Sequence, residues 1–259
     1  MEKRDDLIKF ILDFFGKEEI QKARKFDTYG ANGLQIKGSE NITGIALGVT
    51  ADLEFFKKSV KEKLNFLIVH HGLRLTEVNF SINEILKNRL KYLFDNALTL
   101  MGFHYLLDSH PEVGNNAIVL NRLGAKIIRP FFDDWGWIGK LPKSKSIDQV
   151  MEQLTRIYQC KPMTFLHGKK AVKTIAVVSG GGTIYPYSEI TESLVEGINL
   201  YVTGEAREGT QAICKEGNIN YLSFGHYNTE VIGVQALGEV IQKEFSKLPV
   251  KFIDIPNPL

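Results

Sequence analysis

Short apolar runs rich in β-branched residues alternate with amphipathic stretches along most of the chain. In the first half the runs are strand-like, and the stretches between them carry apolar residues at helical spacing. The expected strands are 42–49, 65–70, 97–103 and 126–130, and the expected helices are 52–64, 82–95 and 115–123, the last ending at Gly124. Alternation of this kind predicts βαβ units and a mainly parallel sheet, which places the protein in the α/β class.

The second half repeats this rhythm after a segment of different texture. That segment is expected to form a turn and short strand at 133–142, a helix at 147–158 capped by Ser146, and an edge strand at 163–167. The rhythm then returns with expected strands at 174–179, 199–203, 221–224 and 250–255, and expected helices at 188–196, 206–215 and 229–245. An amphipathic helix is also expected near the N-terminus, where apolar residues recur from Leu7 to Phe15.

The two halves resemble copies of one unit. In each, the third expected strand is followed by a histidine with an acid four residues later, His104 with Asp108 and His226 with Glu230. We interpret this as an internal duplication that gives two similar βαβ-type lobes, 1–130 and 131–259, with part of the second able to pack into the first. A metal site in the cleft between the lobes is expected, because each half supplies one histidine–acid pair. Residue identity between the halves is low, so chance similarity is the alternative.

The net charge, the lengths of the apolar runs and the cysteine count limit which partners and which cellular compartment are expected. The 259 residues carry 32 basic and 30 acidic side chains for a net charge of +2, so a basic nucleic-acid-binding surface is not expected. No run approaches the ~20 apolar residues that span a bilayer, and the acidic N-terminus argues against a signal peptide. The two cysteines, Cys160 and Cys214, fit neither a disulfide framework nor a zinc ribbon, and a reducing cytoplasm is expected.

The paired histidines His70 and His71 end an expected strand, just before Gly72. Ligands bind at the carboxyl edge of open α/β sheets, and imidazole is the commonest metal ligand. A pair of histidines in a surface turn is the alternative. Adjacent strand residues point to opposite faces, so both rings can serve one site only if the strand has already turned, which the glycine permits.

The two histidine–acid pairs add further candidate ligands. A spacing of four places both side chains of a pair on one face of a helical turn, which suits two ligands of one metal or a ligand with a supporting acid. Helix capping is the alternative for His226 and Glu230. Together with His70 and His71 the set favours a pair of Zn, Fe, Mn or Ni ions over calcium, which prefers oxygen ligands alone.

Three more features are weaker. Glu205, after the second strand of the second half, could be a general base or a supporting acid beside the metals, or simply an acid at a helix N-terminus. The glycine-rich segment 179–182 resembles a phosphate-cradling loop but lacks the lysine of a P-loop. The polar segment 27–35 is expected to be a loop that could line a pocket.

Ordered motifs over nearly the whole chain resemble the Nif-three-like dinuclear metal-binding family, whose members are often described as GTP cyclohydrolase I type 2 homologues. The motifs are Asp27 with Asn32-Gly33-Leu34-Gln35, Gly48-Val49-Thr50, Val69-His70-His71-Gly72, His104-Tyr105-Leu106-Leu107-Asp108, a turn over 136–142, Val202-Thr203-Gly204-Glu205 and Gly225-His226-Tyr227-Asn228-Thr229-Glu230. Two departures are Tyr105-Leu106, where the family usually has Thr-Asn, and Gly72-Leu73-Arg74, where it usually has Pro and large apolar residues.

The resemblance implies a ligand set and an assembly. Two divalent metal ions would be held by His70, His71, Asp108, His226 and Glu230, with Glu230 or Asp108 bridging them. His104 and Glu205 would lie beside the metals as the catalytic residues. Family members resemble ring-shaped homohexamers, so the chain is expected to assemble with itself.

Two functions follow from these expectations. The first is a dinuclear metal-dependent hydrolase in which an activated bridging water attacks a small molecule. The family resemblance implies a nucleotide such as GTP as that molecule. The second is a non-catalytic role as a metal-handling protein or an interaction scaffold with structural metals. An exchangeable coordination position would distinguish a catalytic site from a closed structural one.

Overall fold

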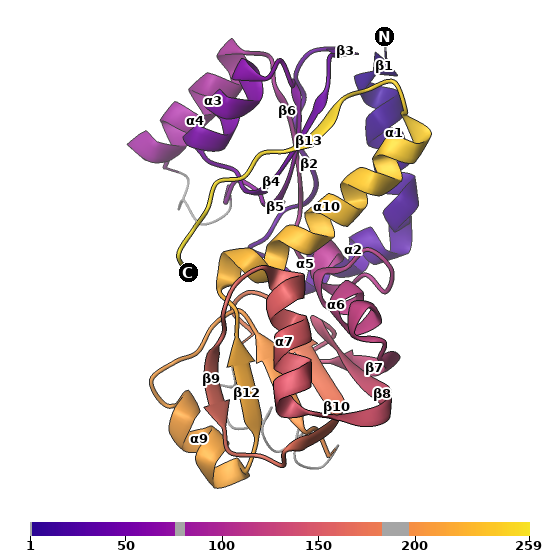
Figure 1. The fold of residues 1–259 in the computed structure, drawn as a ribbon. Helices are drawn as coiled ribbons and strands as arrows, with labels where there is room; N and C mark the ends of the chain where they lie inside the picture. The colour runs from indigo at the N-terminus through magenta and orange to yellow at the C-terminus, as the bar shows by residue number, and fades with distance from the viewer. Residues whose placement is uncertain (1, 76–80, 183–196) are drawn as a thin grey trace. The chain divides into compact units, whose positions relative to one another are not determined.

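The computed structural model describes residues 2–75, 81–182 and 197–259 (Figure 1). The fold is mixed α/β and contains two sheets of mixed parallel and antiparallel strands, which confirms the predicted class. The chain divides into two compact units. Unit 1 comprises Met1–Leu107 and Gly233–Pro256, and unit 2 comprises Asp108–Ile232 and Asn257–Leu259. The lobes 1–130 and 131–259 inferred from duplication stay a prediction, because compact units are defined by packing and not by descent.

Unit 1 is built on a five-stranded sheet. In spatial order its strands are β13 (Val250–Phe252), β4 (Ile45–Thr50), β5 (Phe66–His71), β6 (Thr99–Phe103) and β2 (Asn32–Ile36). The first four run parallel and β2 is antiparallel to β6. The central strands read as near-continuous apolar runs and are buried, as expected for parallel strands covered on both faces. A short ribbon pairs β1 (Glu2–Lys3) with β3 (Asn41–Ile42).

Helices cover both faces of this sheet (Figure 1). On one side lie α3 (Leu53–Lys61) and α4 (Glu84–Asp95), and on the other lie α1 (Arg4–Phe15) and the part of α10 (His226–Glu244) that belongs to unit 1. The first two begin at side-chain caps, Asp52 accepting from the Phe55 amide and Asn83 from the Leu86 amide. Helix α2 (Lys17–Phe26) contacts the antiparallel strand β2, and the short helix α5 (Tyr105–Ser109) follows β6 in the chain.

Unit 2 contains a six-stranded sheet. Its spatial order is β7 (Lys126–Phe131), β8 (Gly136–Ser146), β10 (Ala171–Val178), β11 (Leu200–Thr203), β12 (Asn220–Ser223) and β9 (Met163–Leu166). Strands β10, β11 and β12 pair in parallel, β8 and β9 pair antiparallel with their neighbours, and β9 lies at the edge as predicted. In both units, three neighbouring parallel strands, β4–β5–β6 in unit 1 and β10–β11–β12 in unit 2, are followed in the sheet by one antiparallel strand. This likeness agrees with the duplicated order of elements, and duplication itself stays a prediction.

Capping residues set the ends of two helices in unit 2. Ser146 caps α7 (Ile147–Tyr158), and with Gln149 it forms a complete capping box, which confirms the predicted cap. Helix α6 (Asn115–Leu123) ends as predicted at Gly124, which adopts the left-handed conformation. Both helices pack on one apolar cluster of the sheet, and α9 (Thr210–Gly217) packs on another. The helix expected at 188–196 lies outside the described residues.

The structure differs from the expected elements in two places. The segment 27–35, expected to be a loop, ends in the antiparallel strand β2, whose ladder partner β6 is distant in sequence. The strand expected at 42–49 is split into β3 and β4 around Gly44, where a side chain would clash with Leu64 and Pro249. The predicted last strand is confirmed over Val250–Phe252 and joins the first sheet beside β4.

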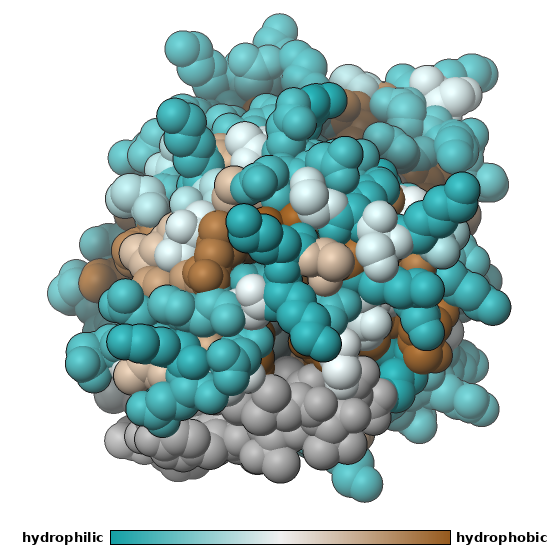
Figure 2. Space-filling model, turned by 60° about the horizontal axis from the view of Figure 1, so that its bottom comes forward, coloured by the Kyte–Doolittle hydropathy of each residue, from teal (hydrophilic) through white to brown (hydrophobic). Residues whose placement is uncertain are grey.

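None of the helices in the described ranges is long and apolar enough to cross a lipid bilayer. On the face seen in Figure 2, hydrophilic side chains predominate and apolar ones occur in small separate groups.

Candidate metal centre

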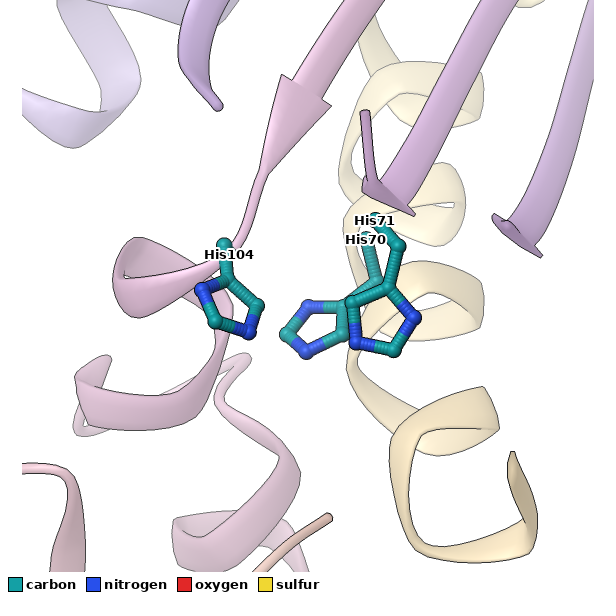
Figure 3. Close-up of side chains that lie close together, drawn as sticks. All are labelled: His70, His71 and His104. Atoms are coloured by element: carbon teal, nitrogen blue, oxygen red, sulfur yellow. The ribbon is translucent and has the colours of Figure 1, made fainter. Parts of the chain in front are cut away.

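Three histidines of unit 1 meet at the carboxyl ends of two neighbouring parallel strands (Figure 3). His70 and His71 end β5, and His104 directly follows β6. The ring centroids are 4.7 Å apart for His70–His71, 4.9 Å for His70–His104 and 5.3 Å for His71–His104. Their planes are tilted by 50–55° to one another, so the rings converge without stacking. Although His70 and His71 are adjacent in a strand, their rings lie together at its end, where side chains lean along the strand.

Each of these rings is held through its Nδ1 atom. His70 Nδ1 lies 3.0 Å from the Phe103 carbonyl oxygen, which can only accept, so this nitrogen carries the proton. His104 Nδ1 lies 2.8 Å from Asp27 Oδ2, and His71 Nδ1 lies 3.4 Å from Thr50 Oγ1. The nitrogen that a metal would take is therefore Nε2 in each ring, the arrangement by which proteins orient imidazole ligands.

Asp27 is the buried acid behind His104. Its side chain is 3% exposed, and its carboxylate also accepts from the Gly30 amide at 2.6 Å and from Asn32 Nδ2 at 2.9 Å. Burial alone would raise the pKa of Asp27, but the contacts with His104, Gly30 and Asn32 outweigh it and lower the pKa to about 2. The carboxylate is thus ionised at neutral pH and fixes the His104 ring.

The polar segment 27–35 forms hydrogen bonds with the chain just after His104 and just after His71. Asn32 Oδ1 accepts from the Leu106 amide at 3.1 Å, just after His104. The Gln35 side chain forms two hydrogen bonds with the backbone of Leu73, which lies just after the paired histidines. It accepts from the Leu73 amide at 2.8 Å and donates to the Leu73 carbonyl at 2.7 Å. These contacts give the motif formed by Asp27 with Asn32-Gly33-Leu34-Gln35 a physical role, which is to fix the positions of the two chain segments that carry imidazoles.

Unit 2 gathers a second set of donors at the start of α10. His226 is the first residue of that helix, and Glu230 follows one turn later, with its Oε1 3.2 Å from His226 Nε2. The other ring nitrogen, Nδ1, lies 2.5 Å from Glu205 Oε1. The Glu230 side chain is 2% exposed, whereas Glu205 is 40% exposed.

These carboxylates control the charge of His226. Burial would lower its pKa, but the hydrogen bonds and charges of Glu230 and Glu205 outweigh burial and raise the pKa to about 9. His226 is therefore protonated at neutral pH, with a carboxylate facing each ring nitrogen.

Asp108 completes this set. It is buried, and its Oδ1 accepts from Asn115 Nδ2 at 2.9 Å and from Ser179 Oγ at 2.6 Å. A carboxylate oxygen of Asp108 and one of Glu230 lie within 4.8 Å of each other, and Glu230 is equally close to a ring nitrogen of His226. Glu230 thus lies within reach of both other donors.

A glycine turn forms the wall beside these donors. Gly180 has a positive φ of 58°, and a Cβ there would clash with Glu230 Oε1. Its amide donates to Thr229 Oγ1 at 2.9 Å. At Gly181 a Cβ would only reach ordinary contact, 3.9 Å from Glu205 Oε2. The glycine-rich segment noted in the sequence therefore lets the backbone approach the carboxylate.

Each predicted site residue lies in one of these two groups. Unit 1 brings together His70, His71 and His104, and unit 2 brings together Asp108, His226 and Glu230, with Glu205 against His226. The residues that sequence reasoning did not assign to the site are the supporting ones, Asp27, Asn115 and Ser179. Imidazole nitrogens and carboxylate oxygens are a donor chemistry that fits Zn, Fe, Mn or Ni.

The chain was compared with protein families, with curated proteins and with solved structures, and the three comparisons agree on one family. The family pattern of Duf34/NIF3 (NGG1p interacting factor 3) matches residues 5–258. A protein named GTP cyclohydrolase 1 type 2 homolog from Archaeoglobus fulgidus is 32% identical over 258 residues, 98% of each chain. The solved structure of the protein ybgI is 31% identical with a TM-score of 0.85, and that of TTHA1606 from Thermus thermophilus is 30% identical with a TM-score of 0.82, each covering 100% of both chains. The chain therefore belongs to the Duf34/NIF3 family.

Proposed function

We propose that this protein is a dinuclear metal-dependent hydrolase. Two divalent ions, Zn, Fe, Mn or Ni, would be held by a joint site whose ligands are His70, His71, Asp108, His226 and Glu230. The observation that carries the proposal is that each unit gathers metal-binding donors beside the ends of its parallel strands, imidazoles in unit 1 and mainly carboxylates in unit 2. Together the two sets would supply the imidazole and carboxylate ligands that suit a bridged pair of ions.

When bound, a pair of divalent ions lowers the pKa of a shared water toward neutrality, which makes hydrolysis possible at physiological pH. The chain's own residues divide the remaining work. Glu230 is suited to bridge, because its carboxylate lies within 4.8 Å of donors on both Asp108 and His226. His104, fixed by ionised Asp27, and Glu205, partly exposed, are placed to carry protons to and from the reacting groups.

The proposed substrate is a small molecule, and a nucleotide such as GTP is the first to test. The support is the name GTP cyclohydrolase 1 type 2 homolog carried by relatives that match nearly the whole chain. A homolog's name does not establish a reaction, and ligands alone do not select a substrate. Gly72, Leu73 and Arg74, which depart from the usual family pattern, are the residues where the choice of substrate is expected to differ.

We also propose self-assembly and a cytoplasmic location. A homohexameric ring follows from family resemblance, and light scattering of the purified protein would test it. The cytoplasm follows from the two cysteines, which are both free thiols in the structure.

The decisive experiment combines metal analysis with a hydrolase screen. The purified protein would be assayed for metal content and then tested on GTP, other nucleotides, phosphoesters and peptides, with and without a chelator. We expect two metals per chain and a chelator-sensitive hydrolysis that is lost in His70→Ala. His167→Ala is the matched control, because it removes a histidine of unit 2 that lies outside both donor sets.

Two outcomes would contradict the proposal. Hydrolysis that survives in a metal-free variant would exclude the mechanism. Inactivity toward every substrate class at full metal occupancy would instead favour the other function, a metal-handling protein or an interaction scaffold.

A further inference from the structure

We propose that unit 1 by itself binds one divalent transition-metal ion through His70, His71 and His104, without help from the carboxylates of unit 2. The inference deepens the proposed function and rests on it, because it says which part of the site is loaded first. It also gives His104 a second role, as a metal ligand while only unit 1 is occupied.

The geometry of the three rings fits one shared ion. A metal about 2.0–2.1 Å from each Nε2, with tetrahedral angles between the bonds, would hold the ring centroids about 5 Å apart. The observed centroid separations are 4.7, 4.9 and 5.3 Å. One ring nitrogen of each histidine also lies within 4.8 Å of those of the other two, and metal binding would draw these atoms closer.

The tilt of the rings excludes a simple stacking cluster. All three interplanar angles fall between 50° and 55°, so no two of these neighbouring rings stack face to face (Figure 3).

The rings are also built to present the same nitrogen. The Phe103 carbonyl, Asp27 and Thr50 each face an Nδ1 atom, so the pattern that orients imidazole ligands in metal sites occurs three times. Asp27 is itself fixed by Gly30 and Asn32, which gives the His104 arm a carboxylate–histidine–metal arrangement. Every residue of this framework belongs to unit 1.

The ligand chemistry predicts which ions bind. Three neutral imidazoles suit Zn²⁺, Co²⁺ or Ni²⁺ and do not suit Mg²⁺ or Ca²⁺, which require oxygen. In unit 2, by contrast, the single imidazole of His226 faces the carboxylates of Glu205 and Glu230. We therefore infer that the first ion enters at the three-imidazole site of unit 1.

The test uses the full chain with the unit 2 ligands disabled. The double variant His226→Ala with Glu230→Gln would be freed of metal by a chelator and titrated with Co²⁺, following heat by calorimetry and the visible bands of the bound ion. We expect one Co²⁺ per chain with absorption typical of four-coordinate nitrogen ligation. Mg²⁺ should give no heat.

Removing one imidazole in this background identifies the ligands. His104→Gln is preferred to alanine, because the amide can still donate to buried Asp27. It should weaken Co²⁺ binding at least about a hundredfold and abolish the visible bands, whereas His167→Ala should change neither. Asp27→Asn should weaken binding about 10–100-fold by releasing the His104 ring. His71→Gln provides the same ligand test if His104→Gln does not fold, as judged by circular dichroism.

The inference is overturned if the folded double variant binds no Co²⁺, or if it binds Co²⁺ equally well after His104→Gln. Either result leaves the proposed hydrolase intact, provided that the unaltered chain still binds two metals and hydrolyses a substrate. Conversely, an unaltered chain that is inactive but whose double variant still binds one Co²⁺ through His104 would reject the hydrolase and keep the three-histidine site.

Discussion

Both units hold a histidine against a carboxylate, but the two carboxylates differ in origin and in burial. In each, a histidine follows the third parallel strand and turns its Nδ1 toward a carboxylate: His104 toward Asp27 after β6, and His226 toward Glu205 after β12. The two acids differ in their distance along the chain from the histidine and in their exposure to solvent. Asp27 lies 77 residues before its histidine and is 3% exposed, whereas Glu205 lies 21 residues before its partner and is 40% exposed.

The difference is between a fixed half, the donors of unit 1, and an adjustable half, the donors of unit 2. The unit 1 donors are imidazoles held by a buried hydrogen bond at His70 and a part-buried one at His104. The unit 2 donors are charged, and Glu205 is open to solvent, so they can exchange a proton for a metal. We expect removal of a donor to weaken metal binding in either unit, and removal of supporting residues to affect folding most in unit 1.

The largest effect is expected from Glu230→Gln. The amide keeps the shape of the side chain but removes the charge that would bridge two ions, so hydrolysis should fall at least about a hundredfold and one metal per chain should be lost. Glu239→Gln, an exposed position on the same helix, is the matched control. Metal analysis and the chelator-sensitive assay measure both results. Two metals retained in Glu230→Gln would show that this residue does not bridge.

The second prediction concerns the pH dependence of the metal-free protein. The pKa of His226 is raised from its ordinary 6.5 to about 9, so the stability that its protonated form contributes is complete below pH 6.5 and is lost as the pH rises through 9. The loss should reach at most about 3 kcal/mol, and partial exposure reduces it. Denaturant unfolding between pH 6 and 10 measures it.

His226→Gln should flatten this profile, because it removes the group that titrates. Saturating metal should flatten it as well, since the cation replaces the proton. A profile unchanged by the substitution would locate the titration elsewhere in the chain.

The third prediction contrasts the two supporting acids. Asp27→Asn leaves buried donors on Gly30 and His104 competing for one oxygen, so the free energy of unfolding should fall by about 2 kcal/mol. Glu205→Gln should cost less than about 1 kcal/mol, because water can replace the lost charge at an exposed side chain. Urea unfolding of the metal-free variants distinguishes them. Equal losses would remove the contrast between a fixed and an adjustable half.

Local signals made part of this structure predictable from sequence. The cap at Ser146, the left-handed end of α6 at Gly124 and the histidines at strand ends depend on neighbours within a few positions. The α/β class follows from alternating patterns of the same short range. These features needed no knowledge of tertiary contacts.

The supporting residues could not be predicted in this way. Asp27 meets His104 across 77 residues and Ser179 meets Asp108 across 71, so no spacing in the sequence relates them. Strand β2 was missed because Asn32–Ile36 contains a glycine and polar residues, and it becomes a strand only through its antiparallel ladder with β6. Such features are determined by packing between distant segments.

The smallest predicted effect tests how closely the backbone of unit 2 approaches its donors. Gly180→Ala brings a methyl group against Glu230 Oε1 and also strains a left-handed residue, so it should weaken metal binding about tenfold. Gly181→Ala adds the same methyl where space exists and should bind metal normally. Gly124→Ala strains an equally left-handed residue with open space around it, so it should lower the free energy of unfolding by roughly 1–2 kcal/mol without changing metal affinity. Calorimetric titration of all three variants with metal separates backbone strain from contact with the carboxylate. Weaker metal binding in Gly124→Ala would assign the effect of Gly180→Ala to strain. Unchanged metal binding in Gly124→Ala would leave contact with Glu230 as the cause of the effect at Gly180.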